Sequence, residues 1–60
     1  MLVRIRFKTY NGFNLTDFFQ NVISVSSDET FVYVAYEKEG SIKTKSYEIT
    51  TIISYDITRG

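Results

Sequence analysis

The segment that most constrains the fold is Thr30–Glu37, which reads Thr-Phe-Val-Tyr-Val-Ala-Tyr-Glu. β-branched and aromatic residues dominate it, and such residues favour strands. Successive side chains of a strand point to opposite faces, so odd and even positions lie on different faces. Both sets are apolar up to Glu37, whereas a strand with one solvent-exposed face would have alternating apolar and polar residues. The segment therefore predicts the central strand of a small antiparallel β-structure, covered on both sides.

The N-terminal segment Leu2–Tyr10 alternates in the way typical of a strand with one buried and one solvated face. The apolar face holds Val3, Ile5 and Phe7, and the basic face holds Arg4, Arg6 and Lys8. Asn11-Gly12 follows, and both residue types tolerate the positive φ of a type I′ turn. We therefore expect a hairpin, with the return arm beginning at Phe13.

Residues 16–21 allow two interpretations. Thr16 can cap a single helical turn through Asp17, Phe18 and Phe19, because its hydroxyl can accept a hydrogen bond from an exposed amide. Alternatively, the return strand continues through a bulge, which would explain the change of phase before Val22. Adjacent Phe18 and Phe19 cannot both point inward on a regular strand. We expect one of them at the surface or over the end of the core.

The rest of the chain predicts short strands joined by turns. In order, we expect a strand at Val22–Ser26, a polar turn at Ser27–Glu29, a hairpin turn at Lys38–Gly40, a polar edge strand at Ser41–Glu48, a 3₁₀ turn at Ile49–Ile52 and a last strand at Ile53–Thr58. The lysines of the edge strand discourage pairing with another sheet edge. The three-residue spacing of the two isoleucines suits a 3₁₀ turn that puts both on one side.

This arrangement resembles the small SH3-like barrels, in which the final strand returns to pair beside the first. The Asn11-Gly12 turn, the Glu39-Gly40 turn and the Ile49–Ile52 break carry the resemblance, which concerns topology alone. The expected fold class is all-β, either an antiparallel meander or an SH3-like barrel. It would have five or six strands and one short helical turn.

The 60 residues allow one small domain, spanning 1–60, and such a short chain buries too little surface to be very stable. Cysteine and histidine are both absent, which removes disulfides and argues against a zinc site. A dense core or self-association must then supply the stability. Ten aromatic residues provide such a core and exceed what it can hold.

The excess of aromatic residues favours a protein-binding surface. We expect the core to contain Val3, Ile5, Phe7, Val25, Val32, Val34, Ile49, Ile52 and Ile57. Five aromatic residues are then candidates for an interface, namely Phe13, Phe18, Phe19, Phe31 and Tyr33. A contiguous aromatic patch on a small domain usually marks a partner surface, although the rings can also cover the barrel ends within one chain. The favoured hypothesis is a non-enzymatic module that binds a protein or itself. Its size and composition fit a phage or mobile-element accessory protein.

The alternative hypothesis is nucleic-acid binding through Arg4, Arg6 and Lys8, with Tyr10 as a stacking neighbour. Residues two apart on a strand lie about 6.8 Å apart, a spacing that can follow a phosphate backbone. Seven basic and seven acidic residues cancel, however, whereas proteins that bind phosphates usually have a basic excess. The row is then more simply the wet face of a strand, paired with acidic residues such as Asp56.

No motif predicts catalysis. Nucleophilic catalysis needs a base beside the nucleophile, and the chain has neither histidine nor cysteine. Ser41 with Lys43 could form a Ser–Lys pair, but both are expected to be solvated. Asp28-Glu29 is the one adjacent carboxylate pair, and its place suggests turn chemistry. We expect no enzyme, cofactor or metal. No apolar run has membrane length, so we expect no membrane partner and a cytoplasmic location.

Overall fold

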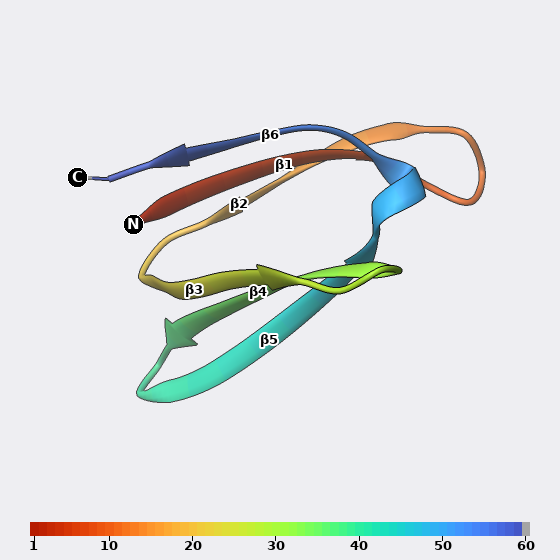
Figure 1. Ribbon diagram of the computed structural model, residues 1–60. Helices are drawn as coiled ribbons and strands as arrows, with labels where there is room; N and C mark the ends of the chain where they lie inside the picture. Colours follow the sequence, from red (N-terminus) through yellow and green to blue (C-terminus); the bar gives the residue numbers. More distant parts are fainter. Residues whose placement is uncertain (60) are drawn as a thin grey trace.

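The computed structural model describes residues 1–59 and contains two three-stranded antiparallel sheets (Figure 1). The elements are β1 (Leu2–Lys8), β2 (Asn14–Phe19), β3 (Val22–Ser27), β4 (Phe31–Lys38), β5 (Ser41–Glu48), the 3₁₀ turn η1 (Ile49–Thr51) and β6 (Ile52–Thr58). One sheet has the order β2-β1-β6 and the other the order β3-β4-β5. The all-β prediction is confirmed at this level, and within residues 1–59 the sheets do not join into a closed barrel.

The sheet β2-β1-β6 is built around the alternating strand β1. Val3 lies opposite Phe19 of β2 and Ile57 of β6, and Ile5 lies opposite Asp17 and Tyr55. The last strand thus returns beside the first, as the resemblance to SH3-like barrels implied. The face that carries Val3 and Ile5 turns toward the second sheet, which leaves the basic face of β1 in solvent.

The sheet β3-β4-β5 is a meander with β4 in the middle, so the prediction of a central strand is confirmed. The prediction that both faces of β4 are covered is wrong. Val34 on the inner face is completely buried, and Val32 and Tyr36 of that face are partly exposed. Phe31, Tyr33 and Ala35 on the outer face are also partly exposed, and none of them is fully buried. No third layer covers this face in the part of the chain that the structure describes (Figure 1). Its apolar residues are shielded only by their neighbours within the sheet.

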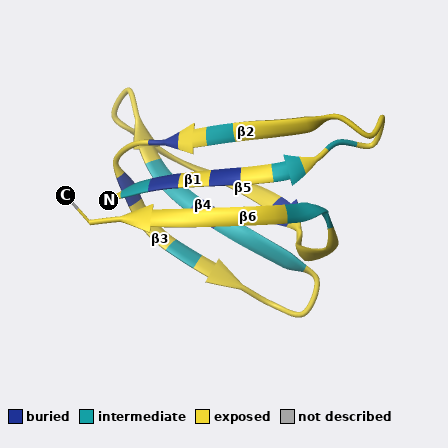
Figure 2. Cartoon of the chain, turned by 90° about the horizontal axis from the view of Figure 1, so that it is seen from above, coloured by how far each residue is buried: buried dark blue, intermediate teal, exposed yellow. Residues whose placement is uncertain are grey.

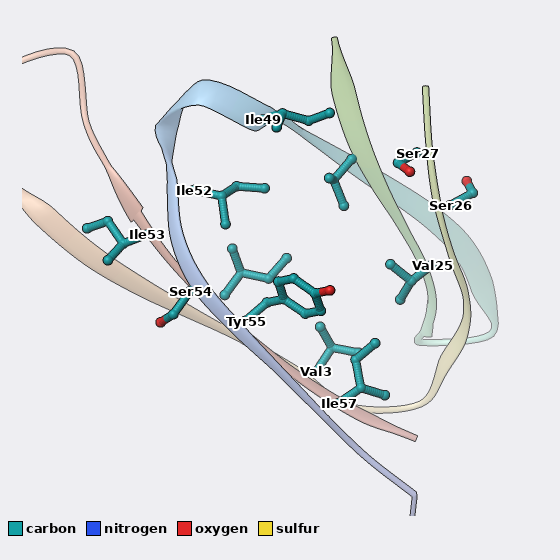
Figure 3. A pocket seen from close by; sticks show the side chains of 12 residues that line it. Val3, Val25, Ser26, Ser27, Ile49, Ile52, Ile53, Ser54, Tyr55 and Ile57 are labelled. Carbon is teal, nitrogen blue, oxygen red and sulfur yellow. The ribbon is translucent and has the colours of Figure 1, made fainter. Parts of the chain in front are cut away.

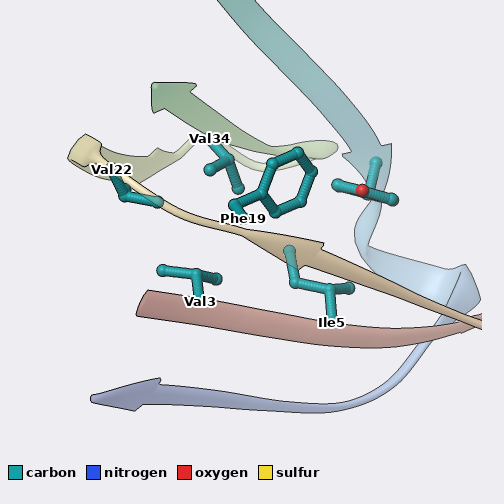
Figure 4. Packing of buried hydrophobic residues seen from close by; sticks show 6 residues of the cluster. Val3, Ile5, Phe19, Val22 and Val34 are labelled. Atoms are coloured by element: carbon teal, nitrogen blue, oxygen red, sulfur yellow. The ribbon is translucent and has the colours of Figure 1, made fainter. Parts of the chain in front are cut away.

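A small apolar core fills the space between the sheets (Figure 4). Its buried members come from five strands and are Val3, Ile5, Phe19, Val22, Val34 and Tyr47. Phe7, Val25, Tyr36 and Ile52 pack against this cluster and are partly exposed. Two residues that we placed in the core, Ile49 and Ile57, are more than two-fifths exposed. Phe19, Val22 and Tyr47 occupy the core instead.

Two bulges set which side chains reach that core. In β3 the register with β4 shifts between Val22 and Ser24, so Ile23 is an extra residue. The shift lets Val22 and Val25 both face inward although they lie three apart. In β6 the register with β1 shifts between Ser54 and Ile52, which leaves Ile53 as the extra residue. A bulge of this kind bends its strand and increases the twist.

The two hairpin turns with glycine differ from each other. Glu39 and Gly40 have φ of 54° and 78°, and two adjacent positive φ angles are the mark of a type I′ turn. Asn11-Gly12, for which we predicted this turn type, does not form it, because only Gly12 has a positive φ. There the Thr9 N–H donates to Phe13 O and the Gly12 N–H donates to Thr9 O, so the loop is one residue longer.

Residues 16–21 form neither of the expected arrangements in full. The first alternative, a helical turn capped by Thr16, does not form, because β2 continues as a regular strand to Phe19. The phase changes in a tight corner after it rather than in a bulge. Asn21 adopts a left-handed φ of 55°, and the Val22 N–H donates to Met1 O. This corner carries the chain from one sheet to the other.

The predicted 3₁₀ turn is confirmed at Ile49–Thr51. The Ile49 N–H donates to Thr30 O at 2.9 Å, and the Thr51 hydroxyl donates to Glu48 O at 2.7 Å. The turn leads the chain from β5 back to the other sheet.

The strand β6 is exposed along nearly all its length. Seen from above, β6 and β2 lie on either side of β1 (Figure 2).

Candidate functional site

An apolar groove opens between β6 of one sheet and β3 of the other (Figure 3). Its volume is about 640 Å³. The twelve lining residues come from β1, β3, β4, η1 and β6, and are Val3, Ile5, Val25, Ser26, Ser27, Val32, Ile49, Ile52, Ile53, Ser54, Tyr55 and Ile57. The floor belongs to the core, since Val3 and Ile5 are buried. We call this cavity the groove.

The mouth of the groove is unusually apolar for a surface. Ile49, Ile53, Tyr55 and Ile57 are exposed by 41%, 47%, 66% and 44%. The Tyr55 ring lies across the opening, and Ile49, Ile52 and Val25 point into it (Figure 3). All twelve lining residues are uncharged, and the polar ones are serines and a tyrosine. Contiguous apolar surface of this kind marks a site of association.

The groove also runs along an edge strand. β6 pairs with β1 on one side only within the described residues, so its other edge offers free backbone N–H and C=O groups. Edge strands usually carry devices that discourage pairing, such as lysine, proline or an inward charge. β6 contains one charged residue, Asp56, and that side chain lies on the opposite face from Tyr55. From Ser54 to Thr58 this edge is regular strand next to an apolar cavity.

The opposite side of the molecule, where β2 lies near β5, is bridged by polar side chains. Asp17 of β2 accepts a hydrogen bond from Lys45 Nζ at 2.6 Å and another from the Tyr47 hydroxyl. Lys45 Nζ also lies 5.3 Å from the Tyr47 ring centroid and 5.8 Å from that of Phe7, within cation–π range. We call the contacts of Asp17, Lys45 and Tyr47 the bridged seam.

The bridged seam perturbs the titration of its members. Partial burial by itself would raise the pKa of Asp17, but the hydrogen bonds from Lys45 and Tyr47 and the charge of Lys45 outweigh it. The pKa of Asp17 therefore lies below its ordinary value. Burial raises the pKa of Tyr47 far above its ordinary value, and the bond to Asp17 adds to the shift. Asp17 thus stays ionised and Tyr47 stays protonated, which keeps the bridge intact at neutral pH.

Three of the four candidate nucleic-acid residues, Arg4, Arg6 and Lys8, lie on the outer face of the sheet β2-β1-β6, as the alternation predicted. Arg4 is paired with Asp56 directly across from it, with Nε 3.1 Å from Oδ2. An acidic residue is therefore interleaved with the basic row. Arg6 and Lys8 form no salt bridge among residues 1–59, and Tyr10 is fully exposed in the following loop. The face is basic at one end and neutralised at the other.

The five candidate interface aromatics do not form one patch. Phe19 is a correction to that set, since it is only 7% exposed and packs against Tyr36 at a centroid distance of 5.0 Å. Phe18 points to the other face of the same strand and is exposed, and Phe13 is exposed in the first hairpin loop. Phe31 and Tyr33 lie together on the outer face of β4, with their ring centroids 6.1 Å apart. Phe19 is in the core, and the other four rings occupy three separate regions of the surface.

The acidic pair Asp28-Glu29 lies at the β3–β4 turn, and the Asp28 side chain bonds the backbone of that turn, as predicted. Asp28 Oδ1 accepts from the Thr30 and Phe31 N–H groups at 2.8 and 2.7 Å. Asp28 Oδ2 accepts from the Tyr33 hydroxyl at 2.7 Å. The Tyr33 bond, followed by those two backbone bonds, lowers the pKa of Asp28, and the same contact raises the pKa of Tyr33. The carboxylate is engaged in holding the turn.

Other kinds of site find no support in the described part of the chain. Residues 1–59 contain no group of three or more Asp and Glu side chains placed to hold a metal ion. None of the elements in that range is a helix long and apolar enough to cross a membrane. Comparisons with protein-family models, with curated proteins and with solved structures find no match to this chain.

The groove residues were not recognised as a site from the sequence. Val25, Ile49, Ile52 and Ile57 appeared as core, because an apolar residue at the right parity looks the same whether or not another strand covers it. The one feature of the sequence that could have indicated the site is that β6 contains no lysine or proline, which edge strands usually carry. It becomes informative only once the strand order places β6 at an edge.

Proposed function

We propose that this chain is a non-enzymatic interaction module that holds an extended, apolar segment of a protein in the groove. The observation that carries the proposal is the uncharged groove beside the free edge of β6. An extended segment can add to a sheet edge through main-chain hydrogen bonds while alternate side chains enter pockets. The groove supplies the pocket and β6 supplies the edge.

A protein segment fits this site better than a small polar ligand. Sites for such ligands contain a few polar groups that converge on one point and fix its orientation. The polar groups of the groove are Ser26, Ser27, Ser54 and the Tyr55 hydroxyl, and Ser54 points away from the opening (Figure 3). Recognition here would rest on apolar contact and on backbone pairing. We therefore expect the site to bind segments of different amino-acid sequences.

A displayed library of seven-residue peptides tests the proposal. Peptides selected on the wild-type protein should be apolar at alternate positions, and calorimetry should show that Ile57→Lys abolishes their binding. Ile42→Lys is the matched control, because Ile42 is 70% exposed on β5 and lies outside the groove. Peptides that bind the Ile57→Lys variant as well as the wild type would contradict the groove as the site.

We further propose that the fold is an opened form of the SH3-like arrangement. The return of β6 beside β1 and the 3₁₀ turn that precedes it support this relation. The groove would then occupy the position where a closed barrel continues from strand to strand. Binding of an extended segment at β6 would cover the side that the chain leaves open.

Nucleic-acid binding through Arg4, Arg6, Lys8 and Tyr10 is the weaker candidate. Asp56 neutralises Arg4, and seven acidic residues balance the seven basic ones over the chain. Binding to phosphates releases counterions in proportion to the cations engaged, so two cations beside a carboxylate give little affinity.

A further inference from the structure

We propose that the segment received beside the groove is β6 of a second copy of this chain, paired antiparallel with the first about a two-fold axis at Tyr55. This inference rests on the proposed function and names its partner. Such a contact is isologous, which means that the same surface is used on both copies. It requires a strand whose order of apolar and polar residues is the same when read in either direction from its centre.

The sequence of β6 has this property. Ile53-Ser54-Tyr55-Asp56-Ile57 is symmetric in character about Tyr55, with isoleucines at both ends and polar residues on either side of the centre. Antiparallel pairing centred there sets Tyr55 against Tyr55 of the second copy and Ile57 against Ile53. Tyr55 and Ile57 share the face of Val3 and Ile5, whereas the bulged residue Ile53 points away from the groove (Figure 3). The apolar contact of the pair therefore comes from the two Tyr55 rings and from Ile57 of each copy, which lies diagonal to Tyr55 of the other. The bulge at Ile53 leaves Ser54, Tyr55 and Asp56, the centre of the pairing, in regular strand.

The charges of β6 also fit this register. Asp56 lies opposite Ser54 of the second copy, so the two Asp56 carboxylates do not face each other, and like charges directly opposite would destabilise the pair. Within its own chain Asp56 is already paired with Arg4. The formal net charge of the chain is zero, so no general repulsion opposes association of two copies.

The other sheet edges are less suited to a second copy. β5 carries Lys43 and Lys45, and lysines on an edge oppose pairing. β2 turns Asp17 inward, where it is bonded to Lys45 and Tyr47. β3 has a bulge at Ile23 and β6 has one at Ile53, so a bulge does not distinguish these two edges. β6 is the edge strand with a self-matching pattern and apolar neighbours. Pairing there would join two sheets into one of six strands, in the order β2-β1-β6-β6-β1-β2.

A single introduced cysteine tests both the partner and the register, because the chain has no cysteine of its own. Residues directly opposite in an antiparallel pair have Cα atoms about 4.5–5.5 Å apart, within the range of a disulfide. Tyr55→Cys should therefore give a covalent dimer under mild oxidation. Ile57→Cys is the control on the same face, since its two copies would lie about 14 Å apart. It should cross-link at least tenfold more slowly.

A second variant tests the register without removing an apolar side chain. Ser54→Asp places a carboxylate opposite Asp56 of the second copy at two equivalent positions, and should raise the dimer dissociation constant about tenfold. Within the chain, Ser54 lies opposite Arg6, so the new carboxylate gains a partner there and the fold is retained. Ser54→Lys should leave dimerisation equal to or tighter than that of the wild type.

Sedimentation velocity of the wild type over a concentration series completes the test. A monomer–dimer equilibrium, with cross-linking specific to Tyr55→Cys, supports the proposal. A monomer at every concentration overturns it, as does a dimer in which Ile57→Cys cross-links as fast as Tyr55→Cys. The peptide selection separates the two levels of inference. A monomer that binds selected peptides at the groove keeps the proposed function and loses only the second copy as partner.

Discussion

The two sides of this small β-structure hold the sheets together in different ways. At the bridged seam, Asp17 of β2 reaches Lys45 and Tyr47 of β5, and ring contacts with Phe7 lie beside them. At the groove, β6 and β3 leave apolar side chains facing an open space, with Tyr55 across the mouth. One side is completed by side chains of the same molecule. The other leaves apolar surface and backbone groups for something else to cover.

The difference shows that a polar bridge disfavours pairing of its sheet edge with another strand, whereas an exposed apolar lining favours binding of a partner. An inward carboxylate with two partners stabilises its own seam, and it makes that edge a poor template for another strand. Ile49, Ile53 and Ile57 at the groove give the isolated chain less stability, because they stay two-fifths exposed or more. They are available for a partner for the same reason.

The largest effect is expected from Phe19→Ala compared with Tyr55→Ala. Phe19 is buried beside Tyr36 and Tyr47, so its removal leaves a cavity and should lower the free energy of unfolding by about 3–5 kcal/mol. Tyr55 is two-thirds exposed, so its removal should cost less than about 1 kcal/mol. Urea unfolding at low protein concentration measures both. Equal losses would show that the groove side is as well packed as the other.

A smaller loss is expected when the bridge is cut. Asp17→Ala leaves the Tyr47 hydroxyl and Lys45 without their acceptor and should cost about 1–3 kcal/mol. The control is Asp56→Ala, which removes a carboxylate of an exposed pair and should change stability by about 0.5 kcal/mol or less. Thermal unfolding of both variants gives the comparison. A loss at Asp56 as large as that at Asp17 would contradict the structural importance of the bridge.

Acid should weaken the bridged seam and leave the groove unaffected. The pKa of Asp17 in the folded protein lies below its ordinary value of 3.8, so its contribution to stability is complete above about pH 5. That contribution is lost as the pH falls through 3.8 toward the lower pKa of the folded state. The stability difference between wild type and Asp17→Asn, measured by urea unfolding, should therefore shrink from pH 6 to pH 3. Asp28 has a lowered pKa as well, so both proteins also lose stability from the β3–β4 turn.

The smallest effect concerns the outer basic face. Asp56→Asn frees Arg4, so it should strengthen any binding of a single-stranded oligonucleotide by about the contribution of one phosphate contact. Fluorescence anisotropy at two salt concentrations measures this for wild type and variant. We expect binding by the wild type to be too weak to saturate. Tight, salt-sensitive binding by the wild type would favour the nucleic-acid alternative over the groove.

The sequence predicted the strands better than the site. Alternation places Val3 and Ile5 inward with no further information, and the isoleucine spacing identifies the 3₁₀ turn before β6. Local pattern does not decide which of Phe18 and Phe19 points inward, because that depends on the register of β2 with β1. Tyr47 lies in a polar strand, and it is buried against Phe7 and Phe19 of the other sheet, with its hydroxyl bonded to Asp17, 30 positions away in the sequence. The groove depends on strand order, which no local pattern contains.

The pairing of β1 with β6 has a consequence for how the chain reaches this structure. Val3 lies opposite Ile57, so the pairing of β1 with the edge strand β6 joins residues that are far apart in the sequence. The strands β3, β4 and β5 are neighbours in sequence and are joined by short turns. Contacts between distant residues require the closure of a long loop, which slows folding. We therefore expect the meander β3-β4-β5 to assemble before β6 pairs with β1.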